Sequence, residues 1–141
     1  MKRKANARWN GTLTDGNGTM RVGSGLFSEG AYSFSTRFED GKGTNPEELI
    51  GAAHAGCFSM ALSAELGDAG FTPDYISTAA EVTVEKSGDG FAITGIHLTS
   101  EAKIPGIDEK RFQEIAAGAK TGCPVSQALK SVPITLDATL K

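Results

Sequence analysis

Apolar and polar side chains alternate along several short runs of this chain, a pattern typical of half-buried β-strands. The alternation predicts strands between turns that are rich in glycine, such as Asp15-Gly16-Asn17-Gly18, and a hairpin at Ser87-Gly88-Asp89-Gly90. We therefore expect an antiparallel sheet of about six strands. The predicted strands are 4–9, 19–22, 31–38, 76–86, 91–104 and Ile134–Leu140.

A long helix is predicted between the third and fourth strands. Asn45 is a good N-cap, Pro46 suits the first helical position, and Glu47 and Glu48 place carboxylates at the positive helix end, where Glu48 can close a capping box. Apolar or small residues then occupy every face until Gly67. A helix that is apolar on all faces needs cover on all sides, and one sheet covers one face only. A second copy of the chain could cover the other, so the pattern predicts an obligate homodimer.

Two shorter helices are predicted near the C-terminus. The first begins near Asp108 and breaks at Gly122, and the second runs from Cys123-Pro124 to about Lys130. The apolar face of the first consists of Phe112, Ile115, Ala116 and Ala119. Helices and strands together predict an α+β fold in which the sheet wraps a long, buried central helix.

Composition limits the classes of function. A length of 141 residues with a net charge of −3 fits one domain over residues 1–141 and lacks the cationic excess expected of a nucleic-acid-binding protein. We expect no membrane span, because the longest apolar stretch is short of about 20 residues. The basic start, Met1-Lys2-Arg3-Lys4, is followed by polar Asn6 instead of an apolar signal-peptide core, which favours a cytoplasmic protein.

The only two cysteines, Cys57 and Cys123, are too few for a secreted disulfide framework. Cys57 lies in the long helix, where a buried, inert thiol is the simplest interpretation. Two observations point to function instead: Gly51 and Gly56 are unusual in a helix, and His54 lies three positions before the thiol on nearly the same helical face. Cys123 is predicted at a helix N-cap, where the helix dipole stabilises a thiolate. Position alone ranks Cys123 as the attacking sulfur, unless a cation such as Arg37 reaches Cys57.

Glu47 precedes Cys57 by ten positions on the same predicted helix. At 1.5 Å per residue the two lie about 15 Å apart along the axis, which no glutamate side chain spans. If Glu47 acts on this thiol, it acts on Cys57 of a neighbouring subunit. A charge that complements the helix dipole is its alternative role.

Three chemistries remain open for these residues, beside a non-catalytic alternative. A thiol peroxidase would combine Cys57, Arg37 and Cys123 as thiolate, cation and resolving thiol. A cysteine hydrolase would pair Cys57 with His54, although neighbours three positions apart on one helix rarely align as nucleophile and base. A zinc site would combine both cysteines with His54 and His97, without any short ligand spacing. The non-catalytic alternative is a dimeric redox-sensing or binding protein with structural cysteines.

Several motifs resemble those of the osmotically inducible protein C (OsmC) family, and the likeness runs from Trp9 to the terminal strand. An Asn-Pro-Glu helix start ten residues before one cysteine, combined with Gly-Cys-Pro-Val-Ser around the other, is specific. The motifs are Thr36-Arg37-Phe38-Glu39, Gly43-Thr44-Asn45-Pro46-Glu47-Glu48-Leu49, Ala52-Ala53-His54-Ala55-Gly56-Cys57-Phe58-Ser59-Met60-Ala61-Leu62 and Gly122-Cys123-Pro124-Val125-Ser126.

The resemblance implies a stress-response peroxidase that reduces organic hydroperoxides and, more weakly, hydrogen peroxide. It assigns Cys57 as the attacking cysteine and Cys123 as the resolving cysteine, which reverses the ranking by helix dipole. It assigns Arg37 and Glu47 to the same site. It further implies an intertwined homodimer with interfacial sites, recycling by lipoyl-type dithiols, and no metal, haem or flavin cofactor.

Overall fold

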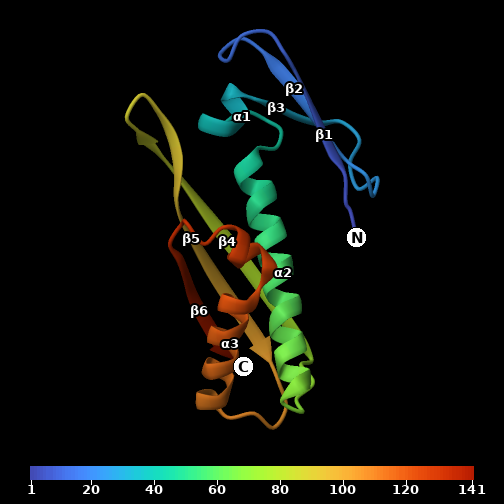
Figure 1. Ribbon diagram of the computed structural model, residues 1–141, viewed down its shortest axis with the longest axis vertical. Coiled ribbons are helices and arrows are strands. Elements are labelled where there is room, and N and C mark those ends of the chain that lie inside the picture. Colours follow the sequence, from blue (N-terminus) through green and yellow to red (C-terminus); the bar gives the residue numbers. More distant parts are fainter. The chain divides into compact units, whose positions relative to one another are not determined.

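The computed structural model describes all 141 residues and comprises two compact units, Met1–Leu49 and Ile50–Lys141, which we describe one at a time (Figure 1). Six strands and four helices are present, and the mixture confirms the predicted α+β class. The predicted single antiparallel sheet is wrong, because the strands form two separate three-stranded sheets. One domain over residues 1–141 stays a prediction.

The first unit contains an antiparallel meander of β1 (Ala5–Asn10), β2 (Asn17–Val22) and β3 (Gly30–Ser33) in that order, as predicted. Gly18 on β2 pairs with Tyr32 on β3. A Cβ atom at this glycine would collide with the Tyr32 ring, so only glycine allows the two strands to pair here with the ring in place.

A short helix, α1 (Phe34–Phe38), replaces the second half of the strand predicted over residues 31–38. Its cause is a capping box in which the Ser33 hydroxyl accepts from the Thr36 amide at 3.2 Å and the Thr36 hydroxyl accepts from the Ser33 amide at 2.8 Å. This reciprocal cap turns the chain out of β3. It also places Arg37 in the last turn of a helix instead of on a strand.

The long helix α2 (Pro46–Asp68) begins and ends close to the predicted positions. The Asn45 side chain accepts from the Glu48 amide at 2.8 Å, which confirms the N-cap. At the other end, Gly70 adopts a φ of 86°, the Gly70 amide bonds the carbonyl of Gly67, and the Phe71 amide bonds that of Leu66. These are the two hydrogen bonds of a Schellman motif, which ends the helix.

By length and composition alone, α2 could cross a membrane, with a mean hydropathy of 1.3. The absence of a membrane span, predicted from the length of the longest apolar stretch, stays a prediction. One such helix is weak evidence for a membrane span, because the core helix of a folded domain passes the same test.

The second unit contains the sheet of β4 (Tyr75–Ser87), β5 (Gly90–Lys103) and β6 (Ile134–Leu140). β4 and β5 form the predicted antiparallel hairpin, with Gly88 at a φ of 60° in its turn. β6 pairs with β5 in parallel, contrary to the prediction. The reason is the connection, because α3 (Glu109–Gly122) and α4 (Pro124–Ala128) carry the chain back along the sheet before β6 begins.

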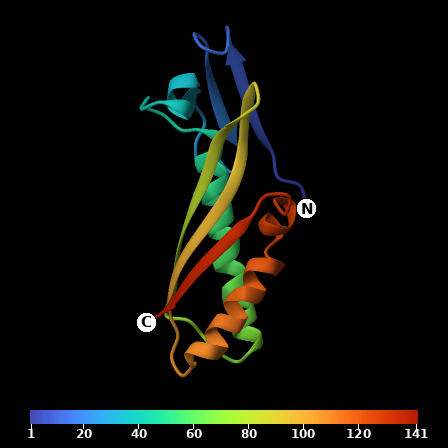
Figure 2. The same ribbon diagram turned by 90° about the vertical axis from the view of Figure 1, so that its left-hand side faces the viewer.

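Helix α3 and the part of α2 in the second unit lie over one face of this sheet (Figure 2). Their shared core includes Phe58, Leu62, Leu98 and Phe112, which are fully buried. The predicted apolar face of α3 is confirmed, since its four residues are all buried. The opposite face of α2 carries small and apolar residues that are exposed in this chain, with Met60 at 77% exposure. The homodimer that would cover this face stays a prediction.

Candidate active site

The two cysteines belong to the second unit and lie close together. Cys57 lies midway along α2 and is partly exposed, whereas Cys123 is the N-cap residue of α4 and is fully buried. Both are free thiols, and their side chains are hydrogen-bonded to each other. Cys57 and Cys123 are far apart along the chain, and the fold brings them together.

The environments of the two thiols favour ionisation of Cys123. Burial raises the pKa of Cys57, and its hydrogen bond to Cys123 raises it further, against a smaller lowering by a backbone hydrogen bond at Val125. Burial also acts to raise the pKa of Cys123, but hydrogen bonds from Cys57 and from the backbone and hydroxyl of Ser126 outweigh it, so this pKa is lowered. The thiols share their protons, and the first ionisation belongs to the pair.

The lowered pKa of Cys123 agrees with the prediction, made from its helix N-cap position, that it is the more acidic thiol. The cause, however, is not the helix dipole. The helix that follows Cys123 is only five residues long, and the Cys123 side chain makes no capping hydrogen bond. Local hydrogen bonds from neighbouring groups, above all the Cys57 thiol and Ser126, stabilise the thiolate form. Cys57 needs a further positive charge to become the more acidic thiol.

Arg37 and Glu47 form an ion pair in the first unit. Nη2 of Arg37 lies 2.6 Å from one Glu47 carboxylate oxygen, and Nε lies 3.1 Å from both oxygens. The Asn45 side-chain amide donates to the Thr36 carbonyl at 3.1 Å and ties the start of α2 to α1, which carries Arg37. The four predicted site residues thus form two pairs, Arg37 with Glu47 in the first unit and Cys57 with Cys123 in the second.

The Glu47 carboxylate is almost fully buried, with a side-chain exposure of 9%, while the Arg37 side chain is 39% exposed. The guanidinium also lies 5.1 Å from the centre of the Phe38 ring, a cation–π contact. Glu47 holds Nε and Nη2, and Nη1 has no hydrogen-bond partner within the chain. This geometry fixes the plane of the guanidinium and leaves one of its nitrogens available to another group.

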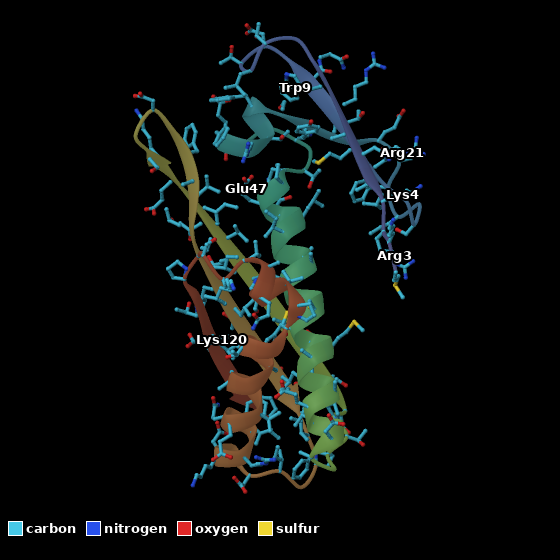
Figure 3. The ribbon with its side chains drawn as sticks, in the orientation of Figure 1. Arg3, Lys4, Trp9, Arg21, Glu47 and Lys120 are labelled. Carbon is cyan, nitrogen blue, oxygen red and sulfur yellow. The ribbon has the colours of Figure 1, made fainter.

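An apolar cavity of about 250 Å³ opens beside Arg37 in the first unit. Figure 3 labels Trp9 on β1, which lines this cavity, and Glu47 at the start of α2. The Trp9 and Tyr32 rings are 5.3 Å apart, and those of Phe34 and Phe38 are 4.9 Å apart. The lining residues are Trp9, Leu13, Tyr32, Ser33, Phe34, Arg37, Phe38 and Pro46.

His54 does not act on Cys57 as a hydrolase would require. It is fully buried, and its Nε2 lies 2.8 Å from the Ser126 hydroxyl oxygen, while Nδ1 has no hydrogen-bond partner. Burial lowers the pKa of His54, so its imidazole is neutral near pH 7. A buried polar atom without a partner costs about 1–3 kcal/mol, which makes this histidine an expensive choice for a core position.

His97 occupies a different place in the second unit from the thiols. Its Nδ1 lies 2.7 Å from the Thr135 hydroxyl and its Nε2 lies 3.4 Å from the Asp137 carboxylate, all within the β5–β6 pair. No group of three or more histidine, cysteine, aspartate or glutamate side chains is arranged to hold a metal ion. The four ligands of the zinc alternative therefore do not form a set.

A family model described as OsmC-like protein matches residues 39–137 of this chain. The chain belongs to the OsmC-like protein family. This confirms the family resemblance stated from the motifs. The match includes Glu47, Cys57 and Cys123, and Arg37 lies two residues before it begins.

Individual relatives of this OsmC-like protein agree with that assignment. It is 57% identical to Peroxiredoxin OsmC of Escherichia coli over 139 residues, which cover 99% of this chain and 96% of the relative. It is 33% identical to the Organic hydroperoxide resistance protein of Xanthomonas axonopodis pv. citri over 103 residues, 71% of this chain and 67% of that one. The crystal structure of OhrB of Bacillus subtilis superposes with a TM-score of 0.73, at 26% identity, and covers 100% of this chain and 98% of that chain.

Sequence reasoning about this OsmC-like protein missed two features of the site. The first is Ser126, which entered only as part of the Gly-Cys-Pro-Val-Ser motif and was given no role of its own. Its position three residues after Cys123, the N-cap residue of a short helix, suits a hydrogen bond to that cysteine. The aromatic cavity was missed because Trp9 and Tyr32 come from the two outer strands of the sheet and Phe34 from a helix. Only the pairing of β1 and β3 with β2 brings them together.

Proposed function

We propose that this protein is a cysteine-dependent peroxidase that reduces organic hydroperoxides, with Cys57 as the attacking thiolate and Cys123 as the resolving thiol. The observation that carries the proposal is a pair of free, hydrogen-bonded thiols in a chain that is 57% identical to a peroxiredoxin over almost its whole length. A peroxidase of this kind needs no other redox group, because the two thiols supply the two electrons.

In the first step the Cys57 thiolate attacks the distal oxygen of the hydroperoxide. An S–O bond forms, the O–O bond breaks, and the leaving alkoxide takes a proton to become the alcohol. Cys57 is oxidised to a sulfenic acid while the peroxide is reduced by two electrons. In the second step Cys123 attacks the sulfenic sulfur, the S–S bond forms, and the S–O bond breaks as the hydroxyl leaves with a proton as water.

The role of Arg37 follows from the electrostatics of Cys57. Burial and the partner thiol raise the pKa of Cys57 within its own unit, so a positive charge is needed to favour its thiolate. The ion pair with Glu47 orients the guanidinium and leaves Nη1 available for the sulfur or a peroxide oxygen. Glu47 and Cys57 lie ten residues apart on α2, so we place the Arg37–Glu47 pair of one subunit at the Cys57 of the other subunit of a homodimer.

The cavity beside Arg37 supports an organic substrate. Its aromatic walls can take up an apolar group, while the guanidinium at its edge attracts the polar peroxide. Hydrogen peroxide offers no apolar group to this cavity and is therefore the weaker substrate. The name of the Xanthomonas relative, an organic hydroperoxide resistance protein, points the same way.

Recycling requires a reductant that returns two electrons to the disulfide. We propose a dithiol of the lipoyl type, which exchanges with the Cys57–Cys123 disulfide and leaves as its own cyclic disulfide. The free thiols suit the reducing cytoplasm, which we propose as the compartment, and a role in the response to oxidative or osmotic stress fits this chemistry. The cycle uses no metal or organic cofactor, no nucleic acid and no membrane partner.

The test is to add an equimolar amount of cumene hydroperoxide to the reduced protein and to map disulfides by mass spectrometry. We expect a Cys57–Cys123 disulfide within one chain and sustained turnover with a lipoyl dithiol. Protein whose thiols are alkylated beforehand is the control. Unlinked cysteines after peroxide treatment, or undiminished turnover in Cys57→Ser, would contradict the proposal.

A second candidate function is a redox sensor in which the same thiols are oxidised without repeated turnover. The free pair of thiols supports it, because two neighbouring thiols can be oxidised to a disulfide once, without a reductant that turns them over. Oxidation by peroxide without turnover under any dithiol reductant would select the sensor over the peroxidase.

A further inference from the structure

His54 is a buried polar residue that the peroxidase cycle described above does not use. Its side chain has no exposed surface and one hydrogen-bond partner, Ser126, at 2.8 Å. Nδ1 of the same ring is buried without any partner. An apolar side chain of similar shape would avoid that cost, so the position favours a residue with a task.

Ser126 connects this histidine to the resolving thiol. Its hydroxyl is within hydrogen-bond distance of His54 Nε2, and it also hydrogen-bonds the sulfur of Cys123. A serine hydroxyl can donate one hydrogen bond and accept others at the same time. The groups Cys123, Ser126 and His54 therefore form a continuous chain of hydrogen bonds from sulfur to imidazole.

We propose that Ser126 and His54 form a proton relay that activates Cys123 for resolution. The inference rests on the proposed function, since it assigns the proton of the resolving step. The Cys123 thiol gives its proton to the Ser126 oxygen, and Ser126 passes its own hydroxyl proton to Nε2 of His54. The thiolate of Cys123 then attacks the sulfenic sulfur of Cys57. The S–O bond breaks, and the proton held on His54 returns through Ser126 and neutralises the leaving hydroxide as water.

The charges around the relay suit this task. Cys57 is the titratable group that faces Cys123 from α2, and burial is the cause that sets the pKa of His54 low, so the imidazole is neutral and ready to accept. Lys120 and Lys130 line a cavity of about 320 Å³ that reaches Ser126.

The relay serves Cys123 and leaves the first step alone. His54 lies three residues before Cys57 on α2, but its hydrogen bond goes to Ser126, and Cys57 interacts with Cys123 and the backbone at Val125. Ser126 is thus a catalytic residue of resolution, because it contacts the reacting sulfur. His54 is a positioning residue that acts through Ser126.

The test separates the two steps in a single turnover. Reduced Ser126→Ala and His54→Gln are mixed with cumene hydroperoxide, and sulfenic acid and disulfide are followed at several pH values. We expect sulfenic acid formation within about twofold of the unmodified protein and disulfide formation slowed about tenfold or more near neutral pH. The loss shrinks as pH rises, because Cys123 then ionises without the relay.

Matched controls exclude a general packing effect. Ser100 is also a buried serine, at 1% exposure and 3.0 Å from the Thr78 hydroxyl, so Ser100→Ala removes a comparable hydrogen bond away from the thiols. His97→Gln is the control for the histidine. Both leave disulfide formation unchanged, and Ser126→Thr, which keeps a hydroxyl, restores most of the rate.

A second readout needs no peroxide. In the Cys57→Ser background the ultraviolet absorbance of the thiolate reports Cys123 alone, and adding Ser126→Ala moves its titration to higher pH. The relay is wrong if Ser126→Ala changes neither that titration nor the pH profile of disulfide formation. If the unmodified protein forms no Cys57–Cys123 disulfide, the proposed function fails, and the relay fails with it as a step of resolution.

Discussion

The two units of the chain differ sharply in how they are held together. The first unit, residues 1–49, has no buried hydrophobic side chain, and its order comes from strand pairing, the Ser33–Thr36 capping box and the Arg37–Glu47 ion pair. The second unit, residues 50–141, packs α2, α3 and its sheet around a core that includes Phe58, Leu62 and Phe112. Thiols lie in the packed unit, and the cation lies in the unit without a core.

Each unit suits the groups that it carries. A pair of thiols that must form a disulfide needs a rigid frame, which a dry, close-packed core provides. A cation and an aromatic cavity that receive a substrate need access to solvent, which a thin sheet allows. A three-stranded sheet without its own core is marginally stable alone, which supports the prediction that a second chain completes the fold.

The largest expected effect tests the core of the second unit. Leu62→Ala removes a fully buried side chain and should lower the free energy of unfolding by about 2–5 kcal/mol. Leu26 in the first unit is 82% exposed, so Leu26→Ala should change it by less than about 0.5 kcal/mol. Urea unfolding followed by circular dichroism measures both. Equal losses for the two variants would show that the first unit has a core as well packed as that of the second.

Next in size is the loss of the cation. Arg37→Met removes the charge that we propose favours the Cys57 thiolate, and it should lower kcat/KM for cumene hydroperoxide about 10²–10³-fold. Arg21→Met removes an exposed arginine of β2 in the same unit and serves as the control. Steady-state assays with a lipoyl dithiol measure both variants. Activity of Arg37→Met close to that of Arg21→Met would show that the first unit does not supply the cation.

A smaller effect is expected from the aromatic cavity. Trp9→Ala removes one wall and should raise KM for cumene hydroperoxide about tenfold, as expected for the loss of apolar contact with one ring. The rate with hydrogen peroxide, which has no apolar group, provides the internal reference and should stay within about twofold. Parallel losses with both substrates would indicate that Trp9 only supports the fold of the first unit.

The smallest effect concerns the buried histidine of the second unit. Burial lowers the pKa of His54 below its ordinary value of 6.5. The unfolded chain therefore binds a proton that the folded chain does not, and the free energy of unfolding falls as pH drops below that value, by at most about 1.4 kcal/mol per pH unit.

Denaturant unfolding at about pH 7 and about pH 5 measures this pH dependence of the free energy of unfolding. His54 contributes the uptake of at most one proton on unfolding. His54→Gln should remove this contribution to the pH dependence, whereas His97→Gln should keep it. An unchanged pH slope in His54→Gln would mean that His54 does not titrate differently in the folded and unfolded states.

Most elements of the fold could be predicted because their signals are local. The Asn45-Pro46 helix start, the Gly88 turn and the alternating run of β6 each depend on neighbouring residues. Two predictions were wrong because they depend on contacts that an alternating pattern does not show. The capping box at Ser33 converts an alternating segment into α1, and the parallel pairing of β6 depends on the path of α3 and α4 over the sheet.

The site could be predicted in part. Its four candidate residues were singled out by residue type and spacing, and the family motifs assigned their roles, but neither source gives distances. The contact between Cys57 and Cys123 and the bidentate pair of Arg37 and Glu47 emerge only from the folded chain. Ser126 was out of reach, because its importance depends on a buried histidine 72 positions away in the sequence.

The central claim is that Cys57, although the less acidic thiol within its own unit, is the sulfur that peroxide oxidises. The most direct measurement is a single addition of cumene hydroperoxide to Cys123→Ser and to Cys57→Ser, each with a reagent that traps sulfenic acid, followed by mass spectrometry of the adduct. We expect an adduct on Cys57 in Cys123→Ser and none in Cys57→Ser. An adduct on Cys123 in Cys57→Ser, with none on Cys57 in Cys123→Ser, would contradict it.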